Sequence, residues 1–301
     1  MKQFYSNGKL LLTAEYLVLD GAKALALPTK SGQELTVQKV FNDELVWMSY
    51  LKTSKIWFFS TYSLSDFSFT KESDLKTAQI LQNILRKSRE LNPEFLRTTH
   101  GYLVKTFLSF PQDWGLGTSS TLINNISQWA NVNPYSLLYK SFGGSGYDIA
   151  CAKNNVPIVF QMNNENPVVE KVNFDPVFKN QLFFVHLNKK QNSGNEISNY
   201  KSIKIDHSAE IQTINRLTEE MILCNNLQEF EKILLEHENI ISKVIKKKTV
   251  QKDLFSDYFG QIKSLGAWGG DFILATGDKK TPAYFKNKGF ETVIRYEDMI
   301  L

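Results

Sequence analysis

Cysteine and histidine are scarce in this sequence, and their scarcity argues against a zinc site. The 301 residues include two cysteines and four histidines. Cys151 and Cys224 are far apart, and neither a CxxC pair nor a Cys/His cluster occurs. One disulfide would use both cysteines, but we expect two buried thiols in a reducing compartment, the cytoplasm.

Long apolar runs and concentrated charge are also lacking. No stretch approaches the roughly 18 apolar residues of a membrane span, and Glu15 and Asp20 interrupt the N-terminal segment, so we expect no signal peptide. The 35 basic and 31 acidic residues leave a net charge of +4. The one basic run, 246–248, ends a helical pattern, where it complements the helix dipole. We therefore expect neither a membrane nor a nucleic acid as partner.

The residues that are present favour a folded α+β protein. Hydrophobic residues make up 42% of the chain and aromatic residues 13%, which suffices for a core. Periodicity and turn signals predict a boundary near 153–157 and the following elements. We expect strands within 4–20, 35–69, 102–110, 157–162, 182–187 and 272–276, helices within 75–91, 122–130, 134–139, 208–224, 227–248 and 251–265, and a final segment near 291–296.

Three glycine-rich turns interrupt this pattern, at 111–121 (PQDWGLGTSST), 142–152 (FGGSGYDIACA) and 265–272 (LGAWGGDF). The first joins a predicted strand to a predicted helix. A helix N-terminus has free N–H groups and a positive dipole end, and glycines let a ligand approach the backbone, so the turn is typical of a phosphate site. Its hydroxyls are also typical of an ordinary helix N-cap, and this alternative stays open.

Better-known phosphate and nucleophile motifs are absent. Gly8-Lys9 is followed by Leu10, so it is not a Walker A loop. Ser120 occupies the place of the third glycine of a dinucleotide fingerprint, and no GxSxG elbow occurs.

Three segments, taken together and in order, resemble the three motifs of the GHMP kinase family, which includes the galactokinase, homoserine, mevalonate and phosphomevalonate kinases. They are 6–21 (SNGKLLLTAEYLVLDG), 111–121 and 265–272. The first is most similar to the mevalonate branch, and the second is the most specific. The resemblance extends over essentially the whole chain. It implies an α+β fold with a ribosomal protein S5 domain 2-like N-terminal domain (1–155), a ferredoxin-like C-terminal domain (156–301) and an active site between them.

The resemblance also implies ATP and Mg²⁺ as cofactors. The middle motif would wrap the ATP phosphates, and its Ser119 would reach Mg²⁺. Glycines of the third motif would pack against the phosphates, although a helix C-cap before a strand is the alternative. The implied ATP-binding residues are Gly115, Leu116, Gly117, Thr118, Ser119, Ser120, Gly266, Gly269 and Gly270.

The first motif and the second glycine turn would supply the reacting groups. By resemblance, Lys9 lies near the transferred phosphoryl group, where a cation offsets developing charge. Glu15 and Ser145 are assigned to the acceptor substrate, with a buried structural carboxylate as the alternative for Glu15. Asp148, in GGSGYD, matches the aspartate that acts on the acceptor hydroxyl, and its alternative is the cap of a turn at 149–152.

The match fails at three places. Asn7 stands where the family has proline, and Ala14 where it has glycine. No acidic residue lies between Asp113 and Asp148, where mevalonate kinases place a second Mg²⁺ ligand. We expect Mg²⁺ to be held by Ser119 with phosphates and water, or by a substitute carboxylate such as that of Asp271.

The resemblance thus implies an ATP-dependent small-molecule kinase of the mevalonate pathway, acting on an alcohol or a phosphate, and we expect a monomer or homodimer. The alternatives are a non-catalytic GHMP-fold binding protein and an enzyme similar to diphosphomevalonate decarboxylase. His100, His186 and His237 are expected to be structural. The polar segment 188–200 is either a substrate loop or a solvated connection.

Overall fold

A computed structural model describes residues 1–163, 166–190, 193–202 and 205–301, which form two compact units. Unit 1 comprises residues 1–8, 31–112 and 116–153, and unit 2 comprises 9–30, 113–115 and 154–301. The chain last enters unit 2 at residue 154, close to the expected boundary. The segments 9–30 and 113–115 depart from that expectation because they belong to unit 2. That the two parts are the N-terminal and C-terminal domains of a GHMP kinase stays a prediction.

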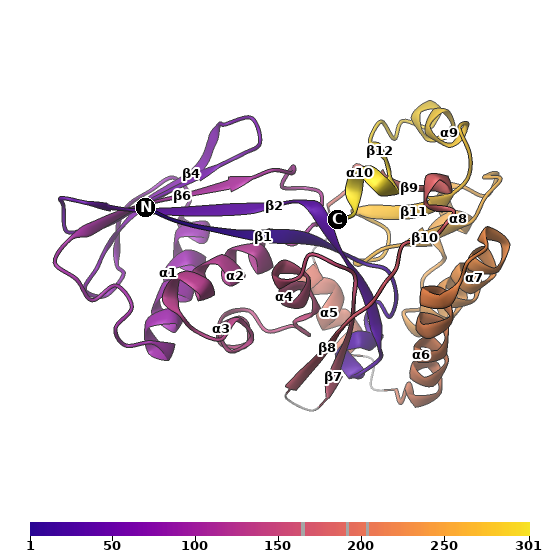
Figure 1. Ribbon diagram of the computed structural model, residues 1–301, viewed down its shortest axis with the longest axis horizontal. Coiled ribbons are helices and arrows are strands. Elements are labelled where there is room, and N and C mark those ends of the chain that lie inside the picture. Colours follow the sequence, from indigo (N-terminus) through magenta and orange to yellow (C-terminus); the bar gives the residue numbers. More distant parts are fainter. Residues whose placement is uncertain (164–165, 191–192, 203–204) are drawn as a thin grey trace. The chain divides into compact units, whose positions relative to one another are not determined.

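Unit 1 is a sheet covered on one face by helices. Its strands follow the order β5-β4-β3-β6-β2, with β3 and β6 parallel and the other neighbours antiparallel. Helices α1, α2 and α3 lie along one face (Figure 1). The elements are β1 (Lys2–Leu11) and β2 (Ala24–Val40), each of which also enters unit 2, β3 (Glu44–Tyr50), β4 (Ile56–Ser63), β5 (Phe69–Glu72), α1 (Leu75–Leu91), β6 (Gly101–Leu108), α2 (Thr118–Ala130), α3 (Pro134–Ser141) and α4 (Tyr147–Lys153).

The core of unit 1 lies between this sheet and its helices. Buried and half-buried residues alternate along β3, the pattern of a strand with one covered face. Large side chains from three strands meet apolar residues of the helices. They include Trp47, Phe58, Tyr62, Val104, Ile84, Ile123 and Leu137.

Unit 2 contains an antiparallel sheet in the order β10-β11-β9-β12. A hairpin of β7 and β8 pairs with Ala24–Ala26 of β2, and α6 and α7 pack side by side. The elements are η1 (Leu17–Asp20), β7 (Ile158–Asn163), β8 (Asn166–Lys171), η2 (Lys179–Gln181), β9 (Leu182–His186), α5 (Ser193–Ser202), α6 (Ser208–Leu223), α7 (Leu227–Val244), α8 (Val250–Leu254), β10 (Ile262–Ser264), β11 (Phe272–Thr276), α9 (Thr281–Asn287), β12 (Val293–Arg295) and α10 (Tyr296–Met299).

Two sequence predictions about elements are wrong. The helix expected over 251–265 ends at Leu254, because Phe255, Tyr258 and Ile262 repeat at helical spacing but enter the core from a turn and a strand. The strand expected over 4–20 ends at Leu11, and a 3₁₀ turn follows. Cys151 is buried as expected, whereas Cys224, at the end of α6, is partly exposed.

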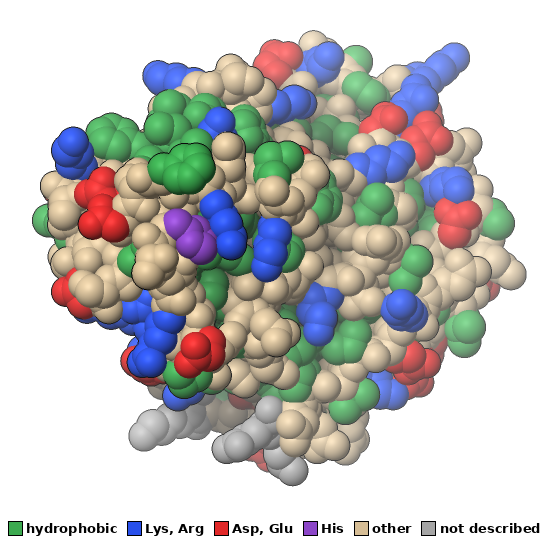
Figure 2. All heavy atoms as spheres, turned by 60° about the vertical axis from the view of Figure 1, so that its left-hand side comes forward, with side chains coloured by type: hydrophobic (Ala, Val, Ile, Leu, Met, Phe, Trp, Pro, Cys, Tyr) green, Lys and Arg blue, Asp and Glu red, His purple; other side chains and the backbone are tan. Residues whose placement is uncertain are grey.

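On the face shown in Figure 2, basic and acidic side chains lie among one another and among apolar ones. Within the described ranges, no helix combines the length and the apolar character needed to cross a membrane.

Candidate active site

The first glycine turn leads from β6 into α2, as the sequence predicts. Gly117 is the residue before the helix and adopts a left-handed conformation with φ 90°. The hydroxyl of the buried Ser120 donates to the Gly117 carbonyl at 2.8 Å, and no side chain of the described residues caps the N-terminus of the helix. Ser119 is exposed and Thr118 half-buried at the start of the helix, where N–H groups and the dipole favour an anion. Leu116 is fully buried, and its expected contact with ATP stays a prediction.

Gly115, two residues earlier, is where the three motifs meet within unit 2. Its carbonyl accepts a hydrogen bond from Lys9 Nζ of the first motif at 2.9 Å. The carboxylate of Asp271, from the third motif, also lies beside this glycine. A Cβ added to Gly115 would lie 2.3 Å from Asp271 Cγ, and Gly115 has φ +64°. Both the close approach and the left-handed backbone therefore require glycine here.

Aromatic contacts hold the start of this turn against the sheet of unit 2. Trp114 packs edge-on against Phe272, with ring centroids 5.3 Å apart, and lies near His186. His186 Nε2 lies 3.1 Å from the Asp113 carbonyl, within hydrogen-bond distance. These contacts agree with the structural role expected for His186.

Asp271 has an unusual backbone. Its φ is +51°, a strained value for a residue with a Cβ. Its N–H donates to the Lys189 carbonyl at 2.7 Å, and its own carbonyl accepts from the Leu187 N–H at 2.8 Å. The segment after β9 therefore fixes Asp271 beside Gly115.

The second glycine turn, in unit 1, precedes α4 and places Asp148 in its first turn. Asp148 is half-buried, and its Oδ1 accepts from the Ile149 N–H at 3.0 Å. Burial, together with the nearby Asp148 charge, raises the pKa of Tyr135 to about 12. Tyr139 donates to the Ser145 carbonyl at 3.3 Å, and α4 packs against α2. The catalytic role of Asp148 and the substrate contact of Ser145 stay predictions.

Glu15 lies in a buried cluster of charged groups in unit 2. Its carboxylate accepts a hydrogen bond from Lys263 of β10. Lys263 Nζ also lies 3.6 Å from Glu238 of α7, and His237 Nε2 lies 3.5 Å from the Glu15 carboxylate. All four side chains are at most 1% exposed. Glu15 therefore has partners within the protein, and its contact with an acceptor stays a prediction.

The protonation states of these side chains balance the charges in the cluster. His237 Nε2 accepts the N–H of Ala14 at 2.9 Å, so that nitrogen carries a lone pair and the imidazole is neutral. Desolvation agrees, because it lowers the pKa of His237 well below 6.5. Desolvation also raises the pKa of Glu15 and raises that of Glu238 to about 8. Glu15, the carboxylate hydrogen-bonded to Lys263, is the anion that balances it, while Glu238 holds its proton at neutral pH.

Lys263 and Glu238 were not predicted as site residues, and the sequence signals for them are faint. Lys263 follows the apolar Ile262 just before a glycine cluster, and Glu238 follows His237 on the buried side of α7. A charged residue at a core position signals a buried pair. The partner of such a charged residue, however, is distant in the sequence here, and the pairing was not predicted.

The third glycine turn links β10 to β11. Gly266 and Gly269 have φ +63° and +80°, and Gly270 is buried. Between them, the Trp268 N–H donates to the Tyr16 hydroxyl at 3.1 Å. The expected phosphate contacts of the three glycines stay predictions.

The polar segment 188–200 is largely helical. Its residues 191 and 192 lie outside the described ranges, and α5 begins at Ser193. Tyr200 donates to Asp20, and its ring lies 5.5 Å from the Tyr16 ring. The described helix therefore packs on the first motif.

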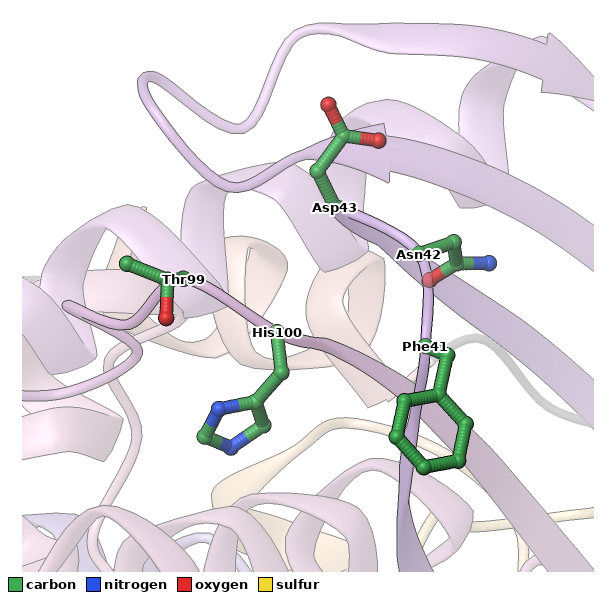
Figure 3. A pocket seen from close by; sticks show the side chains of 5 residues that line it. All are labelled: Phe41, Asn42, Asp43, Thr99 and His100. Atoms are coloured by element: carbon green, nitrogen blue, oxygen red, sulfur yellow. The ribbon is translucent and has the colours of Figure 1, made fainter.

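A separate hollow of about 390 Å³ lies in unit 1, where β2 ends and β6 begins. It is at the opposite end of β6 from the glycine turn. The Asp43 carboxylate points away from the His100 ring (Figure 3), and His100 lies within hydrogen-bond distance of Thr98 at 2.7 Å. Nothing in this arrangement gathers reactive groups.

The fold matches solved structures of small-molecule kinases. The mevalonate kinase of Methanococcus jannaschii is 16% identical, with a TM-score of 0.70 over 97% of this chain and 96% of its own. The phosphomevalonate kinase of Streptococcus pneumoniae, in complex with phosphomevalonate and AMPPNP, is 14% identical, with a TM-score of 0.70 over 98% and 100%. The galactokinase of Lactococcus lactis, complexed with galactose, is 12% identical, with a TM-score of 0.66 over 95% and 88%.

No family model and no curated protein sequence matches the chain. The structural matches cover nearly all of it, and they show that it has the two-domain α+β fold of the GHMP kinases. The fold predicted from the three motifs is thereby confirmed.

Replacing Gly115 tests the packing of Asp271. Gly115→Ala adds both a left-handed strain and a clash, whereas Gly289→Ala adds only the strain, because Gly289 has φ +88° and open space around its Cβ position. We expect the control to lose about 1 kcal/mol of unfolding free energy and Gly115→Ala to lose more than about 2. Urea denaturation measures both, and equal losses would contradict the contact.

Glu238 predicts a pH-dependent stability. Its raised pKa means that the folded protein keeps a proton that the unfolded chain releases above pH 4.5, so its stabilisation is complete below that pH and is lost as the pH rises through about 8. His237 opposes this trend only below pH 6.5. From pH 6.5 to 8, we expect the unfolding free energy to fall by up to about 1.4 kcal/mol per pH unit. Glu238→Gln should flatten this slope in urea titrations, and an unchanged slope would refute the assignment.

Proposed function

We propose that this protein is an ATP-dependent small-molecule kinase that transfers a phosphoryl group to an alcohol or a phosphate, with mevalonate and phosphomevalonate as the first candidates. One observation carries the proposal. Lys9, Gly115 and Asp271 come from three distant motifs and meet around one glycine of a turn that enters a helix. A fold shared with kinases agrees with this interpretation.

The turn from Gly115 to Ser120 would bind the phosphates of ATP. Its helix provides N–H groups and the positive end of a dipole, and its glycines let the phosphates approach. Gly266, Gly269 and Gly270 would complete the phosphate contacts. Because the Ser120 hydroxyl donates to the Gly117 carbonyl, the side-chain donors left for a ligand are those of Thr118 and Ser119.

Mg²⁺ is the expected metal, and the residues present fit it. In the described part of the chain, no group of three or more His, Cys, Asp or Glu side chains is placed to hold a metal ion. Mg²⁺ does not need such a group, because it keeps several waters and binds substrate phosphates with few protein ligands. The exposed Ser119 hydroxyl would be one ligand, and the Asp271 carboxylate is the candidate for a second. When bound, Mg²⁺ neutralises charge on the phosphates.

Lys9 and Asp148 would act on the reacting atoms. The acceptor oxygen forms a bond to the γ-phosphorus, the bond between this phosphorus and the bridging oxygen breaks, and ADP leaves. The Lys9 ammonium would stabilise the charge that develops during the transfer. The Asp148 carboxylate would orient the acceptor hydroxyl and take its proton as the new bond forms.

A non-catalytic binding protein is the second candidate. The absence of an acidic residue between Asp113 and Asp148 favours it, because catalysis then has one carboxylate fewer for Mg²⁺. The presence of both Lys9 and Asp148 favours an enzyme, since binding alone requires neither. A decarboxylase-like reaction would add the release of carbon dioxide.

Turnover assays separate these candidates. The purified protein is incubated with ATP, Mg²⁺ and, in turn, mevalonate, phosphomevalonate, galactose or homoserine, and ADP and carbon dioxide are measured. A kinase forms ADP with at least one acceptor. Tight binding by calorimetry without ADP would instead establish a binding protein.

Asp148→Asn tests the role of the carboxylate. We expect kcat to fall by about 10² to 10⁴, the typical contribution of a general base, while ATP affinity stays within about twofold. Steady-state kinetics and calorimetry measure the two effects. Asp66→Asn, on an exposed loop of unit 1, is the control and should leave both values unchanged. An unaltered kcat in Asp148→Asn would rule out the role.

A further inference from the structure

The turn at Ala14, Glu15 and Tyr16 has a strained backbone. Ala14 has φ 66° and Tyr16 has φ 64°, although both carry a Cβ. Such conformations persist only where the surrounding structure holds them in place. The question is therefore what holds this turn, and for what purpose.

Three distant segments of unit 2 each hold one residue of the turn. His237 of α7 accepts the Ala14 N–H at 2.9 Å. Lys263 of β10 donates to the Glu15 carboxylate, and the Trp268 N–H of the third glycine turn donates to the Tyr16 hydroxyl. Each contact joins positions more than 200 residues apart in the chain.

A buried charge pair is a costly way to gain stability. Lys263 and Glu15 are both withdrawn from water, and a well-packed apolar pair of similar size often stabilises a protein as much or more. Two carboxyl oxygens and His237 Nδ1 have no hydrogen-bond partner in the cluster. The arrangement costs free energy that stability alone does not repay, which favours a role in positioning.

The turn is connected to both ends of the candidate site. It follows the strand that carries Lys9, and Tyr16 is bonded to the glycine turn that ends at Asp271. Lys263 lies just before the same glycine turn. A shift of the strained turn would therefore displace two of the three segments that meet at Gly115.

We propose that His237 and Lys263 are positioning residues, which hold the strained Ala14–Tyr16 turn so that the first and third motifs keep their catalytic arrangement. This inference rests on the proposed kinase function. In this arrangement, the Glu15 carboxylate is the group through which Lys263 holds the turn.

The test for His237 combines kinetics with hydrogen exchange. His237→Leu removes the acceptor of the Ala14 N–H, whereas His237→Gln offers a carbonyl oxygen in its place. We expect His237→Leu to lower kcat/KM for the acceptor and to speed exchange of the Ala14 amide, each by about tenfold. His237→Gln should remain within about twofold of the wild type in both, as should the control His100→Leu.

Relief of the strain provides a second variant. Glycine adopts a positive φ at little cost, so Ala14→Gly should reduce the dependence of the turn on His237. The double variant Ala14→Gly/His237→Leu should therefore lose less kcat/KM than His237→Leu alone. Equal losses in both backgrounds would overturn the role assigned to His237.

The test for Lys263 separates its effect on catalysis from its effect on stability. Lys263→Met leaves a buried carboxylate without its cation, and we expect a loss of both stability and kcat/KM. Lys263→Met with Glu15→Gln removes both charges and should recover stability, while kcat/KM stays about tenfold low because the turn has lost its anchor. Recovery of both would show a purely structural pair. Lys179→Met, which breaks an exposed ion pair, is the control.

The exchange measurement also separates this inference from the proposed function. If the wild-type protein phosphorylates no acceptor, the kinase proposal fails. The positioning network would still be supported if His237→Leu speeds exchange of the amide at position 14, and if it does so less in a protein that also carries Ala14→Gly. Unchanged exchange in His237→Leu would overturn it.

Discussion

The hydrogen bond from Lys9 to the Gly115 carbonyl is the contact around which the candidate site is built. It joins a strand near the start of the chain to the turn that becomes α2. The Asp271 carboxylate occupies the space that a Cβ on the same glycine would need, so no other residue type fits there without displacement. One glycine therefore brings together residues of the first, middle and third motifs.

The buried cluster around Lys263 serves a different purpose in the same unit. With a neutral imidazole and a protonated Glu238, the cluster contains one cation and one anion, which makes its burial tolerable. It stands where the first motif departs from the family pattern. Alanine replaces glycine at position 14, and the resulting strain is held by His237. We infer that the alanine at position 14 and the hydrogen bond from its N–H to His237 belong together.

The structural similarity to known kinases is strong although the sequence similarity is slight. Identities of 12–16% accompany TM-scores of 0.66–0.70 over nearly the whole chain. A core tolerates many hydrophobic substitutions as long as pattern and volume are kept, whereas a backbone with a left-handed turn beside a ligand tolerates few residue types. The glycine turns therefore carried the resemblance, while the rest of the chain shows little of it.

The sequence by itself determined the local elements and the order of the motifs. Helix α1 and strand β11 begin and end where their patterns predict, because a helix cap at Asp74 and a continuous apolar run are local signals. The helical spacing of Phe255, Tyr258 and Ile262 led to a wrong helix prediction, because the same spacing arises when a turn and a strand contribute side chains to one core. Only the tertiary structure placed Lys263 beside Glu15 and Asp271 beside Gly115. Those partners lie more than 150 residues apart, and neither propensity nor periodicity encodes which buried charge or close approach will meet a distant residue.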